Sequence, residues 1–171
     1  MPEAGTLTLL IGGARSGKSA HAERLVKAHA APWAYIATAQ AHDAEMAARI
    51  GHHRARRGEG WETIEAPLDL AGALAALPPG RPVLVDCLTL WLTNHMLAGH
   101  DLEAECGRLA DVLSRPRGPW FVVSNEVGQG IVPDNALARR FRDEAGRFNQ
   151  QVAAAADAVL LMVAGLPLKV K

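Results

Sequence analysis

The segment Gly12-Gly13-Ala14-Arg15-Ser16-Gly17-Lys18-Ser19 directly follows an apolar run, Thr6-Leu7-Thr8-Leu9-Leu10-Ile11. It matches the pattern G-x-x-x-x-G-K-[ST], the P-loop, in which a strand passes through a glycine-rich turn into a helix. In such a turn the backbone N–H groups and the helix N-terminus bind phosphate. Lysine reaches the outer phosphates and the serine hydroxyl binds Mg²⁺. The eight residues therefore predict a nucleotide site, with Lys18 as a catalytic residue and Ser19 as a metal ligand.

Apolar runs alternate with helical patterns along the rest of the chain. Because the runs are continuously apolar, they predict a mostly parallel sheet with helices on both faces, an α/β fold in three layers. A short strand at 62–65 and a C-terminal strand at 168–170, antiparallel after the Gly165 turn, complete the predicted sheet. The main strands are expected at 6–11, 33–37, 82–85, 120–123 and 158–163.

The composition predicts one ordinary globular domain spanning residues 1–171. Eighteen Lys and Arg residues balance eighteen Asp and Glu residues, which disfavours a nucleic-acid partner. No stretch is long and apolar enough to span a membrane, and residues 1–5 lack the basic start of a secretion signal. The two cysteines, Cys87 and Cys106, suggest neither a disulfide framework nor a zinc site, so a cytoplasmic location fits best. The helical spacing of Cys106 with its leucine neighbours predicts a core thiol.

Asp86 closes the apolar run 82–85. At the carboxyl end of a parallel strand its carboxylate is placed to bind Mg²⁺ beside the P-loop. The alternative is that Asp86 caps the helix that begins near Leu88. The two roles are compatible, and we expect Asp86 to contribute to the metal site.

The segment 43–57 predicts a helix with two distinct faces. Glu45, Arg49, His52 and Arg56 share a charged face, whereas Met46, Ile50 and His53 share the other. From spacing alone, His52 is either part of a solvated surface or a nucleophile whose neighbouring arginines neutralise phosphate oxygens. The basic residues also allow a nucleic-acid patch, which the zero net charge disfavours.

The predicted strand at 120–123 leads into the loop 124–133, which contains two glycines. Asn125 or Glu126 could contact metal or substrate at this edge of the sheet. The alternative is a turn that ends the strand and leads to Asp134 as a helix N-cap.

Several motifs together resemble one family over nearly the whole chain, from Leu7 to Lys171. Beside the P-loop they are Tyr35-Ile36-Ala37-Thr38, the stretch from Glu45 to His53, Asp86-Cys87-Leu88-Thr89 and Ser124-Asn125-Glu126-Val127-Gly128. The most specific are Arg49-Ile50-x-His52-His53 and the loop from Asn125 to Pro133. They resemble the bifunctional adenosylcobinamide kinase/adenosylcobinamide-phosphate guanylyltransferases of cobalamin biosynthesis.

This resemblance implies a RecA-like P-loop NTPase fold and two reactions. Adenosylcobinamide is phosphorylated with ATP or GTP, and GMP then passes from GTP to the new phosphate through a guanylylated histidine, which matches His52. Mg²⁺ is the implied cofactor, the corrinoid is the small-molecule partner, and a homotrimer is the implied assembly. Beyond the P-loop, the implied nucleotide contacts are Ile36, Ala37, Thr38, His53, Arg54, Ala55, Arg56, Glu65 and Asp86.

Two other interpretations remain open from the residues alone. A P-loop kinase for another small alcohol would need no covalent histidine step, and a nucleotide-dependent switch would need no small-molecule acceptor. The segment 99–118 matches the family poorly, and where other members have Glu at position 86 this chain has Asp.

Overall fold

The protein is built around one seven-stranded sheet. The computed structural model describes residues 5–171, apart from the side chain of Arg56. Residues 1–4, which the sequence analysis included in the predicted domain, lie outside this description. The strand order across the sheet is β3 (Trp61–Glu65), β2 (Trp33–Ala37), β4 (Val83–Asp86), β5 (Pro119–Asn125), β1 (Thr6–Gly12), β6 (Ala158–Val163) and β7 (Leu166–Lys169). All neighbouring strands are parallel except β6 and β7, which form the predicted antiparallel pair.

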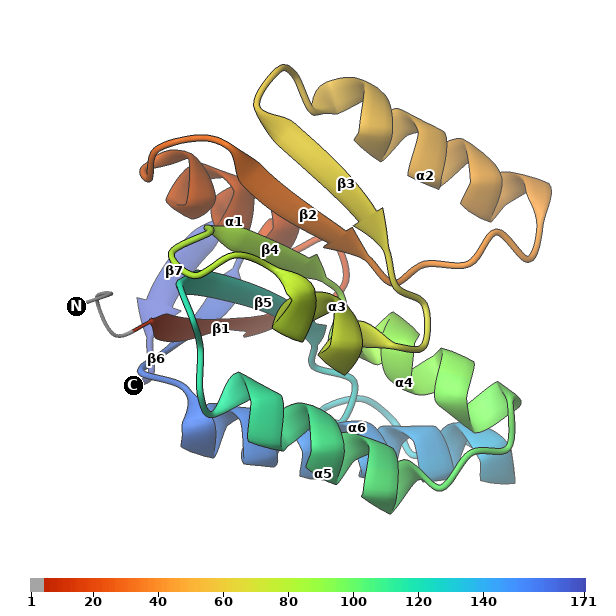
Figure 1. Ribbon diagram of the computed structural model, residues 1–171. Helices are drawn as coiled ribbons and strands as arrows, with labels where there is room; N and C mark the ends of the chain where they lie inside the picture. Colours follow the sequence, from red (N-terminus) through yellow and green to blue (C-terminus); the bar gives the residue numbers. More distant parts are fainter. Residues whose placement is uncertain (1–4) are drawn as a thin grey trace.

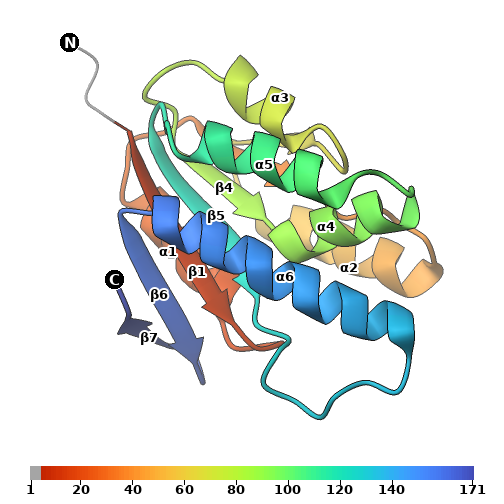
Figure 2. The same ribbon diagram turned by 90° about the horizontal axis from the view of Figure 1, so that it is seen from below.

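Helices cover both faces of the sheet (Figures 1 and 2). One face packs against α1 (Lys18–Lys27), and the other against α3 (Leu70–Ala76), α4 (Leu88–Leu97), α5 (Leu102–Leu113) and α6 (Ala136–Ala155). The remaining helix, α2 (Ala44–Arg56), lies beside β3 at the edge of the molecule. The predicted three-layer α/β fold with a mostly parallel sheet is confirmed.

The apolar runs form the core because both faces of the central strands are covered. Leu7 and Leu9 of β1 point into the larger cluster with α3 to α6, whereas Leu10 points toward α1. Cys106 of α5 is 6% exposed and belongs to the larger cluster, as its spacing predicted. Among residues 5–171, no helix is both long enough and apolar enough to cross a bilayer.

Two predicted caps are wrong. The N-cap of α4 is Cys87, and the N-cap of α6 is Asn135, whose side chain accepts from the backbone N–H groups of Leu137 and Ala138. Asp86 is still the last residue of β4, so its side chain lies before the helix rather than at its first turn. Asp134 lies one residue too early for the cap position.

Candidate active site at the carboxyl edge of the sheet

The P-loop connects β1 to α1 and has the backbone that its glycines predict. Gly17 has φ +93°, and a Cβ at this position would lie 3.0 Å from the Cα of Gly165 in the turn between β6 and β7. Gly165 also donates its N–H to the carbonyl of Ser16 at 2.9 Å. The loop is therefore held against the C-terminal hairpin, while Gly13, Ala14 and Arg15 stay exposed and open to a ligand.

Lys18 is folded back over this loop. Its Nζ donates to the Gly13 carbonyl at 2.5 Å and to Ser16 Oγ at 3.4 Å, and the residue is 6% exposed. Burial lowers the pKa of Lys18, although the nearby Cys87 and Asp86 act in the opposite direction. The ammonium group is thus held within the loop, close enough to Asp86 at the end of β4 for this carboxylate to raise its pKa.

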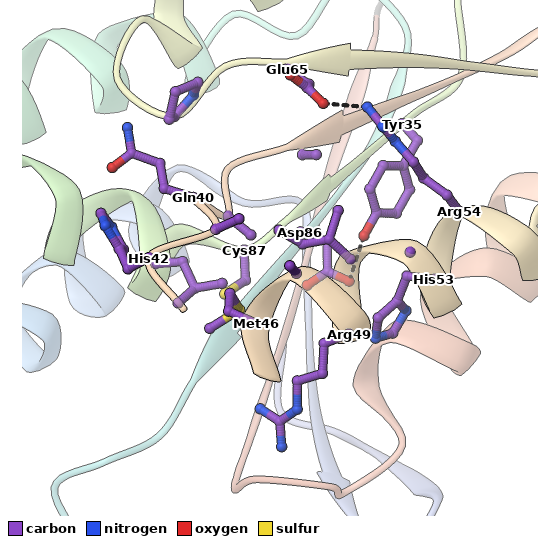
Figure 3. Close-up of a pocket in the computed structure, with 18 of the residues that line it drawn as sticks. Tyr35, Gln40, His42, Met46, Arg49, His53, Arg54, Glu65, Asp86 and Cys87 are labelled. Atoms are coloured by element: carbon purple, nitrogen blue, oxygen red, sulfur yellow. Dashed lines mark hydrogen bonds and ion pairs between the residues drawn. The ribbon is translucent and has the colours of Figure 1, made fainter. Parts of the chain in front are cut away.

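Asp86 ends β4, and its Oδ2 accepts a hydrogen bond from Tyr35 Oη at 3.1 Å. Tyr35 is buried in β2, and burial together with the adjacent carboxylate raises its pKa far above the ordinary value. Tyr35 is therefore a fixed donor that orients one oxygen of Asp86 and leaves the other uncommitted. Figure 3 shows this contact in the centre of the site.

The donor set around the P-loop fits Mg²⁺. Ser19 offers a half-buried hydroxyl and Asp86 a half-buried carboxylate, both hard oxygen ligands of the kind that Mg²⁺ prefers. Within the described part of the chain, no group of three His, Cys, Asp or Glu side chains gathers into a metal cage.

A buried polar network behind Asp86 was not predicted. Thr38 Oγ1 donates to the Cys87 carbonyl at 2.7 Å and accepts from the Cys87 N–H at 2.9 Å. Asn94 Nδ2 of α4 donates to the carbonyls of Thr38 and Pro67 at 2.8 and 2.9 Å. Asn125 Nδ2 of β5 donates to Thr89 Oγ1 at 2.9 Å. The network ties together the carboxyl ends of four strands, β2, β3, β4 and β5, and the polar residues Thr89 and Asn94 in the largely apolar helix α4 were its sequence signal.

A second feature opens beside Asp86, a cavity of about 860 Å³ between α2 and the ends of β2, β3 and β4. Met46, Ile50 and His53 are half-buried and line it, which confirms the predicted inner face of α2. Asp86, Cys87 and Asn125 form the opposite wall. Burial raises the pKa of the Cys87 thiol to about 11, so this side chain is a neutral part of the wall rather than a nucleophile.

The structure separates the two histidines that the sequence analysis singled out. His53 lines the cavity (Figure 3), whereas His52 is exposed on α2 and stands outside the cavity wall. Consecutive helical residues point about 100° apart, and His52 lies on the part of the helix that does not line the cavity. Both remain within one turn of Arg49, which also lines the cavity.

The other predicted nucleotide contacts fall into three groups. Arg54 and Glu65 line the cavity and form an ion pair with each other (Figure 3). Ala37 lines the cavity, whereas the side chains of Ile36 and Thr38 are fully buried. Ala55 is exposed outside the cavity wall, and the side chain of Arg56 is outside the described part of the structure.

Glu126, the other candidate at this edge, accepts the Gly128 N–H at 2.6 Å through its side chain. Its own N–H donates to the Gly12 carbonyl at 2.9 Å, which joins the end of β5 to the start of the P-loop. The geometry is that of a turn that ends the strand.

Comparison with known sequences identifies the family of the chain. The family model described as cobinamide kinase / cobinamide phosphate guanyltransferase matches residues 8–170, which include the P-loop, α2 and the loop after β5. The chain belongs to this family. It is a bifunctional enzyme of adenosylcobalamin biosynthesis, a cobinamide kinase and a cobinamide-phosphate guanylyltransferase that acts on nucleotide and cobinamide substrates.

Curated relatives are similar over nearly their entire lengths. The bifunctional adenosylcobalamin biosynthesis protein CobP of Pseudomonas aeruginosa is 49% identical over 166 residues, 95% of this chain and 96% of the relative. The corresponding protein CobU of Escherichia coli K12 is 44% identical over 181 residues, 96% of this chain and 99% of the relative.

Solved structures support the fold independently. An ATPase from a type III secretion system has a TM-score of 0.58 at 11% identity and covers 97% of this chain and 57% of its own. The RadB recombinase has a TM-score of 0.55 at 19% identity, with 92% and 74% covered. The cobinamide kinase/guanylyltransferase chain thus has the RecA-like P-loop fold that its sequence predicted.

Proposed function

We propose that both reactions take place at this one edge of the sheet, with phosphoryl transfer at the P-loop and guanylyl transfer in the cavity beside α2. The observation that carries the proposal is the position of Asp86, which lies in electrostatic contact with Lys18 of the P-loop and also forms part of the cavity wall. Cobinamide phosphate formed at the P-loop would need to move only past Asp86 to reach the cavity.

In the kinase half, ATP or GTP binds with its phosphates on the exposed P-loop backbone. Lys18 releases the Gly13 carbonyl and takes up a phosphate oxygen, which neutralises charge during transfer. The substrate hydroxyl oxygen bonds to the γ-phosphorus, the bond to the β–γ bridging oxygen breaks, and the nucleoside diphosphate leaves. The hydroxyl proton passes to solvent, and the catalysis is mainly positioning and charge stabilisation.

Ser19 and Asp86 would hold Mg²⁺ in this arrangement. When bound there, the ion would supply charge neutralisation for phosphoryl transfer. Tyr35 contributes by keeping one Asp86 oxygen engaged, so the other oxygen faces a defined direction.

In the guanylyltransferase half, a neutral His52 nitrogen attacks the α-phosphorus of GTP and pyrophosphate leaves. The cobinamide-phosphate oxygen then attacks the same phosphorus, the P–N bond breaks, and the histidine returns to its starting state. The assignment to His52 rests on the family motif. Because His52 stands outside the cavity wall, the step needs α2 to turn, and the exposed surface of this helix offers little packing to resist that.

The family resemblance also supports a homotrimer that works in the cytoplasm. Both cysteines of the chain are free thiols, as a reducing compartment requires. Apolar side chains are exposed in the loop after β5 and at the start of α6, next to the active edge, where subunits could meet: Val127, Ile131, Val132 and Leu137.

The experiment that tests the covalent step uses GTP labelled at the α-phosphate. The protein is incubated with Mg²⁺ and this GTP, denatured, and assayed for label that is stable to base and released by acid. We expect such label in the wild type and in His53→Ala, and none in His52→Ala. His53→Ala is the matched control, because it removes the adjacent imidazole, the one that faces the cavity.

Two outcomes would contradict the proposal. Label lost in His53→Ala but kept in His52→Ala would transfer the nucleophile's role to His53. A folded wild type that binds GTP without becoming labelled would leave a P-loop kinase with no covalent histidine step.

A further inference from the structure

Arg57 is the residue where the chain leaves α2, and the family resemblance assigns it no role. Its backbone turns to φ −83° and ψ 110°, an extended conformation. The side chain therefore departs from both helical faces and reaches the aromatic wall of the cavity, where Arg57 is one of the lining residues.

The Arg57 guanidinium is stacked on Tyr35. The guanidinium carbon lies 3.5 Å from the centre of the Tyr35 ring, a cation–π contact. Tyr35 is itself fixed, since its hydroxyl donates to Asp86 and the Trp61 ring meets its edge at 6.2 Å and 78°. The cation is thus held by its flat face, while its N–H bonds all point outward from the edge of the plane.

Those N–H groups lack acceptors. Nε and Nη1 of Arg57 are both buried and find no hydrogen-bond partner among the described residues. Of the neighbouring carboxylates, Glu65 is paired with Arg54, and Asp86 has one oxygen engaged by Tyr35 and no bond to Arg57. Burying N–H donors of a cation without acceptors costs free energy, which a bound oxyanion would offset. The planar edge of the guanidinium fits two oxygens of a phosphate.

We propose that Arg57 binds a substrate phosphate group in the cavity and that Tyr35 holds it ready to do so. This inference rests on the proposed function, because it places a phosphate beside α2. The shared chemistry is a phosphate oxyanion, which either the nucleotide or the phosphorylated corrinoid can supply. No covalent step falls to Arg57, which contributes binding and charge neutralisation only.

The test compares two variants, Arg57→Gln and Arg57→Lys. The matched control is Arg115→Gln, which removes an exposed arginine that is paired with Asp111 far along the chain. With Mg²⁺ present, Kd values are measured for GTP and for guanosine, and KM for adenosylcobinamide phosphate in GMP transfer. If the nucleotide supplies the phosphate, Arg57→Gln weakens GTP about tenfold or more and leaves guanosine unchanged. If the corrinoid supplies it, GTP binding stays and KM for the corrinoid phosphate rises about tenfold or more.

Arg57→Lys keeps the positive charge but not the planar, two-pronged donor set of the guanidinium. We therefore expect it to lose less affinity for the phosphate ligand than Arg57→Gln, and it replaces that variant if Arg57→Gln fails to fold. Constants for GTP and the corrinoid phosphate that stay within about twofold of wild type would overturn the proposal, as would equal losses for GTP and guanosine, which indicate a structural role. A wild type that transfers no GMP would contradict both the proposed function and this inference. Normal GMP transfer by the wild type, together with unchanged constants for Arg57→Gln, would contradict the inference alone.

Discussion

Lys18 is buried in the P-loop of the cobinamide kinase/guanylyltransferase. Its contacts to Gly13 and Ser16 do not fully offset desolvation, since burial is the largest influence on its pKa and lowers it. The residue that serves the phosphates therefore weakens the fold without them. This is the trade between stability and activity expected at a functional site.

We expect Lys18→Met to abolish most kinase activity, on the order of 100-fold, and to raise the Tm at pH 7. The folded pKa of Lys18 lies below the unfolded value, so between these pKa values the unfolded chain binds more protons and wild-type stability rises with pH. The Tm advantage of Lys18→Met should accordingly shrink between pH 7 and 10. Thermal melts across this range check it.

Lys27→Met is the control, because Lys27 is exposed at the other end of the same helix. It should change neither the activity nor the pH dependence of the Tm. A Lys18→Met protein that melts below the wild type at every pH would show that the contacts of Lys18 outweigh its burial.

At the scale of elements, α4 does more than cover the sheet. Asn94 donates from this helix to the carbonyls that follow β2 and β3, the loops that border the cavity. One buried side chain thus fixes the separation of two strand ends. The cost of removing it is set by the two carbonyls that would be left buried without donors.

We expect Asn94→Leu to lower the free energy of unfolding by about 2 kcal/mol or more, because each unsatisfied buried carbonyl costs roughly 1–3 kcal/mol. Denaturant unfolding measures this. Thr93→Ala on the same helix is the matched control, since the Thr93 hydroxyl bonds only within its own helix, to the Thr89 carbonyl. Equal losses in the two variants would contradict a bracing role for Asn94.

The elements themselves were predictable because the parallel strands are buried on both faces. Unbroken apolar runs gave all five main strands, and the P-loop pattern placed the first strand, turn and helix with one motif. The alternative caps at Asp86 and Asp134 each lie one residue too early. At α6 the neighbouring Asn135 is an equally good cap, whereas α4 begins at Cys87 without any side-chain cap.

The candidate site was predictable only in part. Helical spacing correctly put His53 on the inner face of α2, but Arg57 follows the last turn, where helical periodicity no longer says which way a side chain points. The bonds of Thr38, Asn94 and Asn125 join residues far apart in sequence. Such pairings depend on strand order, which one sequence does not display.

At the scale of the whole molecule, the exposed apolar side chains near the active edge bear on assembly. Ile131 is 97% exposed, in the loop between β5 and α6. Several exposed apolar side chains in one loop and the helix that follows it are of the kind found at subunit contacts. Its place beside the P-loop agrees with active sites that lie near subunit boundaries, as the family resemblance implies.

We expect wild-type protein to sediment at three times the 18.2 kDa chain mass and Ile131→Asp to shift toward the single chain, since a carboxylate would be buried in the interface. Analytical ultracentrifugation at several concentrations measures this. Leu97→Asp, at an exposed apolar position on α4, should leave the mass unchanged. A wild type that sediments as a single chain, or an Ile131→Asp protein with the full mass, would be evidence against this interface.

The position of β1 between β5 and β6 has a consequence for the growing chain on the ribosome. The P-loop leaves the exit tunnel early, yet both hydrogen-bonding neighbours of its strand are made only in the second half of synthesis. At about 5–20 residues per second, β1 waits several seconds before either edge is paired. The Ser16–Gly165 contact also forms late, because it needs the turn between the final two strands. The P-loop is thus among the first parts to be translated, yet its complete set of contacts requires the C-terminal hairpin.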